Sequence, residues 1–302
     1  MTEKIKITFL GTSDAVPSVN RNHTAILLNY KDENILIDCG EGTQRQFRKA
    51  GLNPCKLTRI LITHWHGDHV LGIPGILQTL ALSGYKKTLF IYGPKGTKNF
   101  IKELFKTFVF MNKFSIKVFE IYKKGKFFDT KEFYIESEKM THTTYCNAYS
   151  FVKKGQIRID KGKLKKYKLP HGPLLQQLKQ GKDIIHNEKK YFSRNLTFKE
   201  KEKKVSFVFD SSMNNWIAKF VKDSDLLVCE ASFGSELRER AKDYKHLTSE
   251  QAAEIAKKSK SKKLILTHIS QRYENNLGKI LDEAKKVFKN SHLAKDLDVV
   301  EV

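Results

Sequence analysis

The sequence predicts an α/β protein in which β-sheets are sandwiched between helices. Short apolar segments typical of strands alternate along the chain with amphipathic segments typical of helices. No segment repeats, and several of the apolar segments end on a histidine or an aspartate. With 302 residues, 40% of them hydrophobic, and only 6 prolines, the chain can bury the core that such a domain needs.

The predicted elements follow one another in an order that supports this fold class. Residues 5–10, 23–30 and 34–40 are expected to form three strands of a meander, because each is apolar and polar turns separate them. The other predicted strands cover 59–64, 88–94, 115–122, 133–142, 148–152, 204–210, 225–231 and 263–268, and the predicted helices cover 42–51, 70–84, 96–108 and 249–259.

Two of the predicted helices carry clear sequence signals. The helix over 249–259 is expected to begin after Thr248, with Gln251 completing a capping box. In the helix over 96–108 the apolar residues recur at helical spacing, which predicts that they face the core. These apolar residues are Phe100, Ile101, Leu104, Phe105 and Phe108.

The cysteines and the N-terminus indicate where the protein works. Cys39, Cys55, Cys146 and Cys229 are far apart and form no Cys-x-x-Cys pair, which indicates neither a disulfide framework nor a thiolate zinc site. The chain shows no apolar leader at its start and no apolar run long enough to span a bilayer. We therefore expect a cytoplasmic protein that makes no contact with a membrane.

The stretch THWHGDHVLG at 63–72 crowds three histidines around one aspartate, directly after an apolar strand. A structural histidine usually occurs singly, so this cluster predicts a metal site. Further acidic and imidazole groups also follow apolar strands, which is where α/β folds place their functional sites. The clustered residues are His64, His66, Asp68 and His69, and the others are Asp38, His142, Asp210 and His268.

The net charge of +23 indicates an anionic partner, and nucleic acid is the most common one for such an excess. Residues 153–190 alone carry a net charge of +9, from eleven lysines and one arginine against two aspartates and one glutamate. The simpler interpretation is a solvated charged loop, because runs of charge often serve only solubility.

Motifs along nearly the whole chain resemble the ribonuclease Z family of the metallo-β-lactamase superfamily. The resemblance implies an α/β fold, the αββα four-layer metallo-β-lactamase sandwich with a protruding basic arm. Residues 1–302 would form a single domain, with a flexible tRNA-binding arm inserted at about 153–190. The motifs are FLGTSDAVP at 9–17, DCGEGTQRQF at 38–47, THWHGDH at 63–69, CEAS at 229–232, KHLTSEQAAEIA at 245–256 and THISQRY at 267–273, together with His142 and Asp210.

The resemblance also implies a zinc-dependent endoribonuclease that removes the 3′ trailer from precursor tRNA. Two zinc ions per chain are expected, and manganese or iron suits the same nitrogen and oxygen ligands. Asp68 is further expected to accept a proton from the attacking water, and Asp38 to orient a histidine ligand from behind it. The expected ligands are His64, His66 and His142 for one ion, Asp68, His69 and His268 for the other, and Asp210 for both.

Two further residues match the pair that the family uses to protonate the departing 3′-oxygen. They are Glu230 and His246, in the segments CEAS and HLT. Cys229 stands where the family has a histidine, so the role of this position is left open. A purely structural alternative for His246 is a residue that supports the helix beginning after Thr248.

The expected partner is precursor tRNA, bound by a homodimer in which the arm of one subunit presents the tRNA to the metals of the other. LPHGPLLQQLKQG at 169–181 resembles the family's arm, and lysines there would neutralise phosphates without reading bases. The loop at 17–22 resembles a family loop near the cleaved bond, although Val19 replaces a lysine. The expected tRNA-binding residues are Arg21, Asn22, Lys163, Lys165, Lys166, Gly172, Pro173, Lys179 and Lys182.

Two alternative functions fit part of these observations. A thioester or lactone hydrolase of the same superfamily would use the metals but leave the basic segment without a role. A non-catalytic RNA-binding protein would use the charge but leave seven metal ligands without one. The native metal, the cleavage position relative to CCA and the dimer interface do not follow from the sequence.

Overall fold

The computed structural model describes residues 3–109, 113–170 and 172–302. These residues form two compact units. The larger unit comprises residues up to 128, then 135–151 and 204–302, and the smaller one comprises 129–134 and 152–203. The predicted arm at 153–190 lies within the smaller unit.

The first large sheet begins with the predicted meander and continues with parallel strands. Strands β1, β2 and β3 pair antiparallel, and β4, β5 and β6 then join β3 in parallel. Strand β18 closes the other edge, antiparallel to β1. The sheet order is β18 (Val299–Glu301), β1 (Lys6–Gly11), β2 (Ala25–Tyr30), β3 (Glu33–Ile37), β4 (Arg59–Leu61), β5 (Leu89–Gly93) and β6 (Ile116–Glu120).

The second large sheet also contains a parallel half, in which β14, β15, β16 and β17 run in the same direction. Strands β15 and β16 are buried along their whole length, as is typical of parallel strands covered on both faces. The sheet order is β17 (Ser291–Leu293), β16 (Leu264–Thr267), β15 (Leu226–Glu230), β14 (Lys203–Val208), β9 (Cys146–Lys153), β8 (Phe133–Met140) and β7 (Gly125–Asp129).

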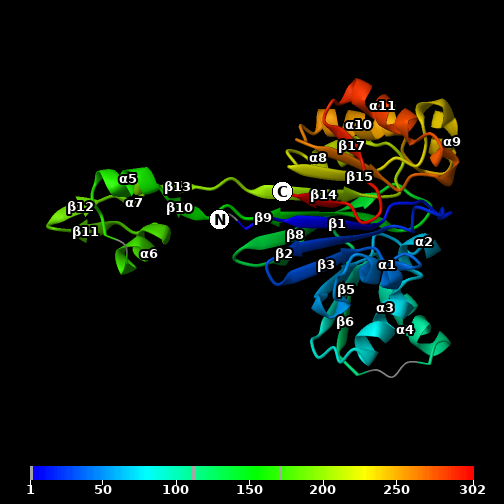
Figure 1. The fold of residues 1–302 in the computed structure, drawn as a ribbon, viewed down its shortest axis with the longest axis horizontal. Helices are drawn as coiled ribbons and strands as arrows, with labels where there is room; N and C mark the ends of the chain where they lie inside the picture. The colour runs from blue at the N-terminus through cyan, green and yellow to red at the C-terminus, as the bar shows by residue number, and fades with distance from the viewer. Residues whose placement is uncertain (1–2, 110–112, 171) are drawn as a thin grey trace. The chain divides into compact units, whose positions relative to one another are not determined.

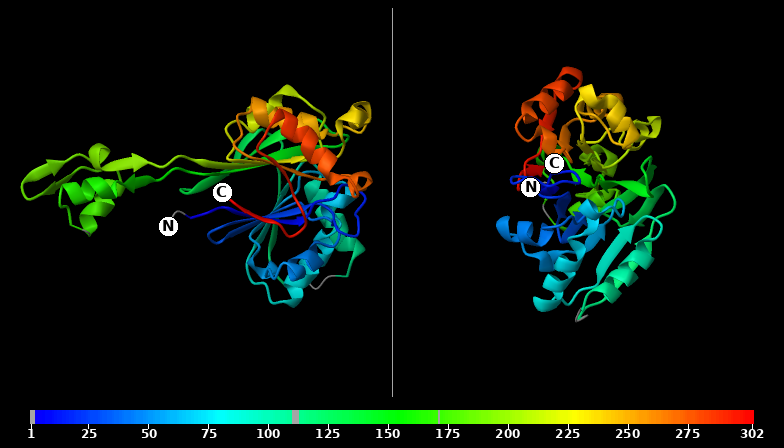
Figure 2. Two further views of the ribbon diagram at one scale, coloured as in Figure 1. Left: turned by 45° about the horizontal axis from the view of Figure 1, so that its top comes forward. Right: turned by 90° about the vertical axis from the view of Figure 1, so that its right-hand side faces the viewer.

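Helices cover the outer face of each sheet, so the larger unit has four layers (Figures 1 and 2). One apolar cluster fills the space between the first sheet and its helices, and another does so for the second sheet. The predicted αββα sandwich is confirmed. The helices on the first sheet are α1 (Thr43–Lys49), α3 (Ile73–Leu82) and α4 (Thr97–Thr107), and those on the second are α8 (Asn215–Phe220), α10 (Ser249–Lys258) and α11 (Leu277–Val287); the short α2 (Gly67–Val70) and α9 (Arg238–Asp243) belong to loops.

A polar contact joins the two sheets close to the ends of their strands. The hydroxyl of Tyr149, in β9, is fully buried and donates to the carbonyl oxygen of Ile62, just after β4, at 2.7 Å. The rings of Tyr30 and Phe151 meet edge to face across the same interior, with centroids 5.5 Å apart. Both contacts fix one sheet against the other, and the hydrogen bond does so beside the end of β4.

Helix α4 follows the predicted packing in part. Ile101 is buried, and Leu104 and Phe105 are partly buried against the same apolar cluster, whereas Phe100 and Phe108 are 45% and 48% exposed. Phe108 follows the last helical residue and takes an extended backbone conformation, so it leaves the helical face. Phe100 lies one position before Ile101 and packs against Trp65 instead.

The capping box at the start of α10 is confirmed, since the side chains of Thr248 and Gln251 each bond the other's backbone N–H. In the larger unit, some α-helices and strands have no counterpart among the predicted ones. These are the whole C-terminal part, with α11, β17 and β18, and the short elements α2, α8, α9 and β7.

The smaller unit has an apolar core of its own. Five buried residues form it, and four of them are leucines, three of which lie on the short helices α5, α6 and α7. A lysine-rich segment with such a core is more than a solvated loop. The core residues are Leu164, Leu169, Leu178, Ile184 and Leu196, and the elements are β10 (Ile157–Ile159), α5 (Lys161–Lys166), α6 (Pro173–Lys179), β11 (Ile184–His186), β12 (Lys189–Tyr191), α7 (Ser193–Leu196) and β13 (Thr197–Lys199).

Candidate metal centre

The site lies where strands of both large sheets end. Asp38 follows β3 and His64 closely follows β4, while the second sheet contributes Asp210 after β14 and His268 after β16. Asp38, Asp210 and His268 take left-handed backbone conformations, with φ of 55°, 39° and 54°. Few residues other than glycine adopt such angles, and they concentrate at functional sites. The turn that ends each strand therefore brings its polar side chain into the site.

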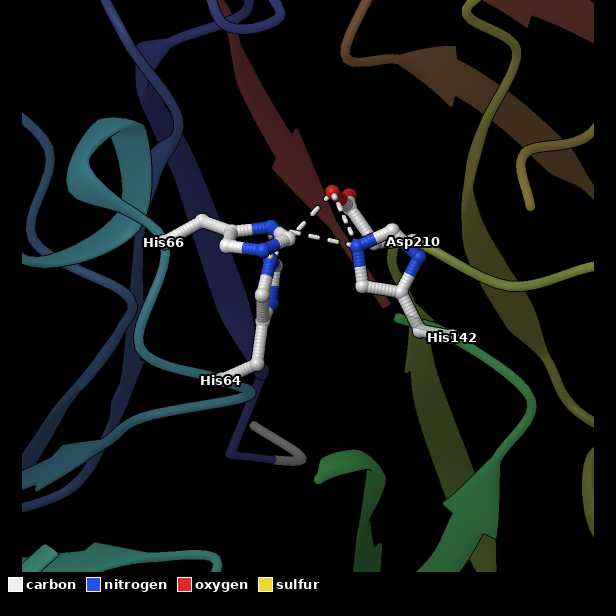
Figure 3. Close-up of side chains that lie close together, drawn as sticks. All are labelled: His64, His66, His142 and Asp210. Carbon is white, nitrogen blue, oxygen red and sulfur yellow. Dashed lines mark hydrogen bonds and ion pairs between the residues drawn. The ribbon is translucent and has the colours of Figure 1, made fainter. Parts of the chain in front are cut away.

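Four side chains form the first predicted ligand group, shown in Figure 3. One nitrogen or oxygen of each lies within 4.8 Å of the others. Nε2 of His64 is 3.3 Å from Oδ2 of Asp210, and Nε2 of His142 is 3.7 Å from the same oxygen. Nδ1 of His66 lies 3.0 Å from the nitrogen of His64 and 3.1 Å from that of His142. The first sheet thus provides two of these residues and the second sheet the other two.

Asp210 also belongs to the second predicted group, with Asp68, His69 and His268. Its Oδ1 is 3.5 Å from Nε2 of His69 and 3.3 Å from Nε2 of His268. Oδ2 of Asp68 lies 3.2 Å and 3.3 Å from the same two nitrogens. The two oxygens of Asp210 therefore face different groups, which is the geometry expected of a bridging carboxylate.

Side chains and carbonyls behind the histidines hold the ring orientation. Nδ1 of His69 is 2.7 Å from Oδ2 of Asp38, which is the position predicted for this buried aspartate. Thr63 donates its backbone N–H and its hydroxyl to Asp38, and its hydroxyl is also 3.1 Å from Nδ1 of His64. Nδ1 of His142 lies 3.1 Å from the carbonyl oxygen of Lys245. In each case the ring turns its Nε2 inward.

The residues present fit a bound cation. Asp210 is buried, and its Oδ1 makes no hydrogen bond within the described part of the chain, which is costly unless a cation is nearby. Burial opposes a charge on His69, yet the carboxylates of Asp210, Asp68 and Asp38 raise its pKa well above the usual range. A metal ion can supply this positive charge in place of protons. Imidazole nitrogens and carboxylate oxygens without thiolates suit zinc in a catalytic site.

Glu230 and His246 lie beside the second group. Nδ1 of His246 is 2.9 Å from Oε2 of Glu230, and its Nε2 makes no hydrogen bond to any described residue. Burial alone would lower the pKa of His246, but Glu230 and Asp210 raise it to about 9. The two carboxylates therefore favour the protonated form of His246, next to the predicted ligands.

Ser232 was not among the predicted residues, although it lies at the centre of this arrangement. Its hydroxyl donates to Oε2 of Glu230 at 2.7 Å and lies 2.9 Å from Nδ1 of His268. It thus joins the Glu230–His246 pair to His268, a predicted ligand. The only sequence signal for Ser232 was its place in the CEAS motif, two residues after Glu230. Ser232 and Thr63, which precedes His64, were both missed because a single hydroxyl residue forms no distinctive sequence pattern.

Cys229 takes no part in the site. Strand β15 alternates its side chains, so Glu230 faces the site while Cys229 is buried in the apolar cluster under α10. Burial raises the pKa of its thiol well above the usual range, which leaves the thiol neutral. Cys229 therefore packs as a small apolar residue.

A cavity of about 550 Å³ opens onto these residues. Two arginines and two aromatic side chains line it in addition to the predicted groups. A phosphodiester with adjoining bases matches such a lining, because guanidinium groups bind phosphate and aromatic rings stack on bases. These additional residues are Arg240, Arg272, Phe233 and Tyr244.

The two residues expected to bind tRNA in the loop at 17–22 have partners inside the protein. Arg21 is 4% exposed and donates to the hydroxyl of Thr12 at 2.8 Å and to the carbonyl oxygen of Ala294 at 2.9 Å. The side chain of Asn22 donates to the carbonyl oxygen of Glu41 at 2.6 Å. Both residues fix the loop, and their contact with RNA stays a prediction.

The residues expected to bind tRNA in the smaller unit are exposed. Gly172 and Pro173 start α6, so they also set the direction of the chain there. His171, in the same motif, lies outside the described residues. The exposed lysines lie on α5 and at or after the end of α6, and they are Lys163, Lys165, Lys166, Lys179 and Lys182.

Solved structures share the fold of this chain. The short form of human tRNase Z matches with a TM-score of 0.71 and 26% identity over 98% of each chain. The metallo-β-lactamase fold protein YhfI from Bacillus subtilis matches with a TM-score of 0.72 and 20% identity over the whole of both chains. Fold and site together define a metal-dependent protein of the metallo-β-lactamase fold.

Sequence relatives identify the family within this class to which the chain belongs. Ribonuclease Z from Bacillus cereus strain G9842 is 36% identical over 97% of this chain and 98% of its own, and that from Bacillus thuringiensis strain Al Hakam is equally similar. A family model described as Anti-Pycsar protein Apyc1 matches residues 5–286. The chain belongs to the ribonuclease Z family and to the family that this model describes. The family predicted from the motifs is confirmed.

The shared position of Asp210 leads to a testable prediction. Asp210→Ala removes the one carboxylate that faces both groups, so the protein should lose at least one bound metal ion per chain and its hydrolytic activity. Elemental analysis of the purified protein and an activity assay measure the two effects. Asp282→Ala, at an exposed aspartate of α11, is the matched control and should keep both. An Asp210→Ala protein with its full metal content would contradict the shared role.

Proposed function

We propose that the protein is a metal-dependent endoribonuclease that removes the 3′ trailer from precursor tRNA. It leaves a 3′-hydroxyl on the tRNA and a 5′-phosphate on the trailer. The observation that carries the proposal is the placement of the Glu230–His246 pair beside two ligand groups that share Asp210. Ribonuclease Z relatives that match along the whole chain support the substrate.

The proposal includes two zinc ions per chain, a homodimer and a cytoplasmic location, as the resemblance to the family implies. His64, His66 and His142 would hold one ion, Asp68, His69 and His268 the other, and Asp210 both. Bound there, such ions supply Lewis-acid stabilisation of the attacking and leaving oxygens of a phosphodiester. No helix within the described residues has the length and apolar character needed to cross a membrane.

The chain's own groups account for the movement of protons. The attacking water adds its oxygen to phosphorus, the P–O3′ bond breaks, and Asp68 accepts a proton from the water. A ribose 3′-oxygen is a poor leaving group, so it needs a proton as it departs. His246 can donate one from Nε2, because Glu230 holds the ring through Nδ1. Ser232 and Ser211 in turn fix both oxygens of Glu230.

The smaller unit is the proposed binding surface for the folded part of the tRNA. Its exposed lysines can neutralise backbone phosphates, which gives strong, salt-dependent binding that does not depend on base sequence. The apolar core of this unit holds those lysines on a defined surface. A small-molecule thioester or lactone hydrolase would have no use for it.

The substrate can be tested directly by incubating the metal-loaded protein with a precursor tRNA and, separately, with a thioester. We expect a single endonucleolytic cut at the 3′ side of the tRNA, a 3′-hydroxyl on the tRNA product and no thioester hydrolysis. Sequencing of the product ends and a thiol assay measure the outcomes. Thioester hydrolysis with intact tRNA would favour the small-molecule alternative, and binding of tRNA without any cleavage would favour the non-catalytic one.

The role of His246 predicts an effect that depends on the leaving group. His246→Ala should slow single-turnover cleavage of precursor tRNA by about 10²–10⁴-fold, which is the usual contribution of general acid catalysis. Hydrolysis of bis(p-nitrophenyl) phosphate should fall far less, since nitrophenolate leaves without a proton. His292→Ala, at an exposed histidine in β17, is the control. Equal losses on both substrates, with folding and metal content unchanged, would remove His246 from the catalytic residues.

The lysines of α5 give a separate prediction about affinity. Changing Lys163, Lys165 and Lys166 together to alanine should weaken tRNA binding, and the slope of the salt dependence should fall by about one for each phosphate that is no longer neutralised. Binding titrations at several salt concentrations measure both. The control variant changes three exposed lysines at the end of α11 and just after it to alanine, namely Lys285, Lys286 and Lys289. It loses the same charge, but its affinity for tRNA and its salt dependence should change little. Identical behaviour of the two triple variants would argue that only total charge matters.

A further inference from the structure

A second cavity, of about 610 Å³, lies next to the ligand histidines, and the reaction described above does not use it. It shares His142 and Thr143 with the cavity that contains His246. Its other walls come from the loop between β5 and α4, the residues after β6, and the end of β8 and start of β9 with the segment that joins them. A strand of nucleic acid can therefore extend from one cavity into the other past His142.

Two exposed tyrosines form the walls of this second cavity. Tyr122 is 54% exposed and Tyr145 is 59% exposed. The hydroxyl of Tyr122 donates to Glu120, whose carboxylate also accepts the backbone N–H groups of Gly96 and Lys98 at the start of α4. The ring of Tyr122 is thus held in place while its face is open to solvent. Exposed, fixed aromatic rings are the surfaces on which single-stranded bases stack.

Cations lie beside these rings. Nζ of Lys95 is 5.6 Å from the centre of the Tyr145 ring, and exposed Lys139 lines the same cavity. Aromatic rings with neighbouring lysines bind single-stranded nucleic acid, because the rings stack on bases while the lysines neutralise phosphates. The hydroxyl of Thr143, 3.4 Å from Nε2 of His66, adds a polar group where the two cavities meet.

The chemistry of the cut decides which part of the substrate each cavity receives. The bond that breaks is P–O3′, and the 3′-oxygen that needs the proton belongs to the tRNA side. His246 lines the first cavity and not the second. The last nucleotide of the tRNA therefore occupies the first cavity, and the strand beyond the phosphate continues into the other.

We propose that the cavity between Tyr122 and Tyr145 binds the first nucleotides of the 3′ trailer by stacking their bases. This assignment rests on the proposed function. It predicts that the enzyme selects substrates with a single-stranded trailer of any base sequence, because stacking accepts every base. It also predicts that the released 5′-phosphorylated trailer is a competitive product inhibitor.

A double-mutant cycle between enzyme and substrate tests this proposal. One substrate is a precursor tRNA with an ordinary trailer, and the other has abasic residues at the first three trailer positions. Tyr145→Ala should lower kcat/KM for the ordinary substrate about 10-fold, which corresponds to one stacked base. The abasic trailer should cause at least as large a loss with the wild-type protein. With the variant it should cause a smaller further loss, because only the stack on Tyr122 is left to lose. Trp216→Ala, at an exposed tryptophan of α8 that lines neither cavity, should behave as wild type.

The possible results separate this proposal from the proposed function. If the wild-type protein cleaves the ordinary and the abasic substrates equally well, or if the two losses add, the trailer assignment is wrong while the function stands. If it cleaves no precursor tRNA at all, the proposed function fails and the trailer assignment fails with it. Thermal unfolding and metal analysis of Tyr145→Ala check that a loss of activity comes from binding and not from folding.

Discussion

The carboxylate of Asp210 is the constraint on which the rest of the structure depends. It is buried, and its two oxygens face histidines from different parts of the chain. A carboxylate in this position is stable only if positive charge surrounds it, so the two ligand groups must stay within a few ångströms of each other. Because each group contains residues from both sheets, the centre needs a sandwich whose two sheets cannot shift relative to each other. The hydrogen bond between Tyr149 and Ile62 provides part of that rigidity, immediately beside the ligands.

Many residues of the site could be predicted because histidines and aspartates are uncommon residue types and occur here in clusters. Three histidines and an aspartate in one short segment, and polar groups at the ends of apolar strands, are unusual patterns. Thr63 and Ser232 escaped prediction since a hydroxyl is common everywhere, and only the folded structure shows which hydroxyls meet a histidine nitrogen. The second cavity could not be predicted either, because its walls come from three segments far apart in the sequence.

The fold, too, has parts that could be predicted from the sequence and parts that could not. Central strands and the capped helix α10 have strong local signals, and they were predicted. Edge strands such as β17 and β18 have three residues each, so packing against a neighbour decides them more than their own sequence does. In the smaller unit the many lysines hide any apolar periodicity of the few leucines that form its core. The sequence of this segment was therefore also compatible with a charged loop. Phe100 was misplaced because periodicity describes a helix face but cannot show that Trp65 offers another partner.

The left-handed backbone at Asp38, Asp210 and His268 has a consequence for how this protein can change over time. Each such residue costs of order 1–3 kcal/mol relative to a relaxed backbone, and glycine would remove most of that cost. The centre therefore places three functional side chains at positions where the backbone conformation itself favours glycine. Stabilising mutations are consequently best sought in the outer helices, far from the strand ends.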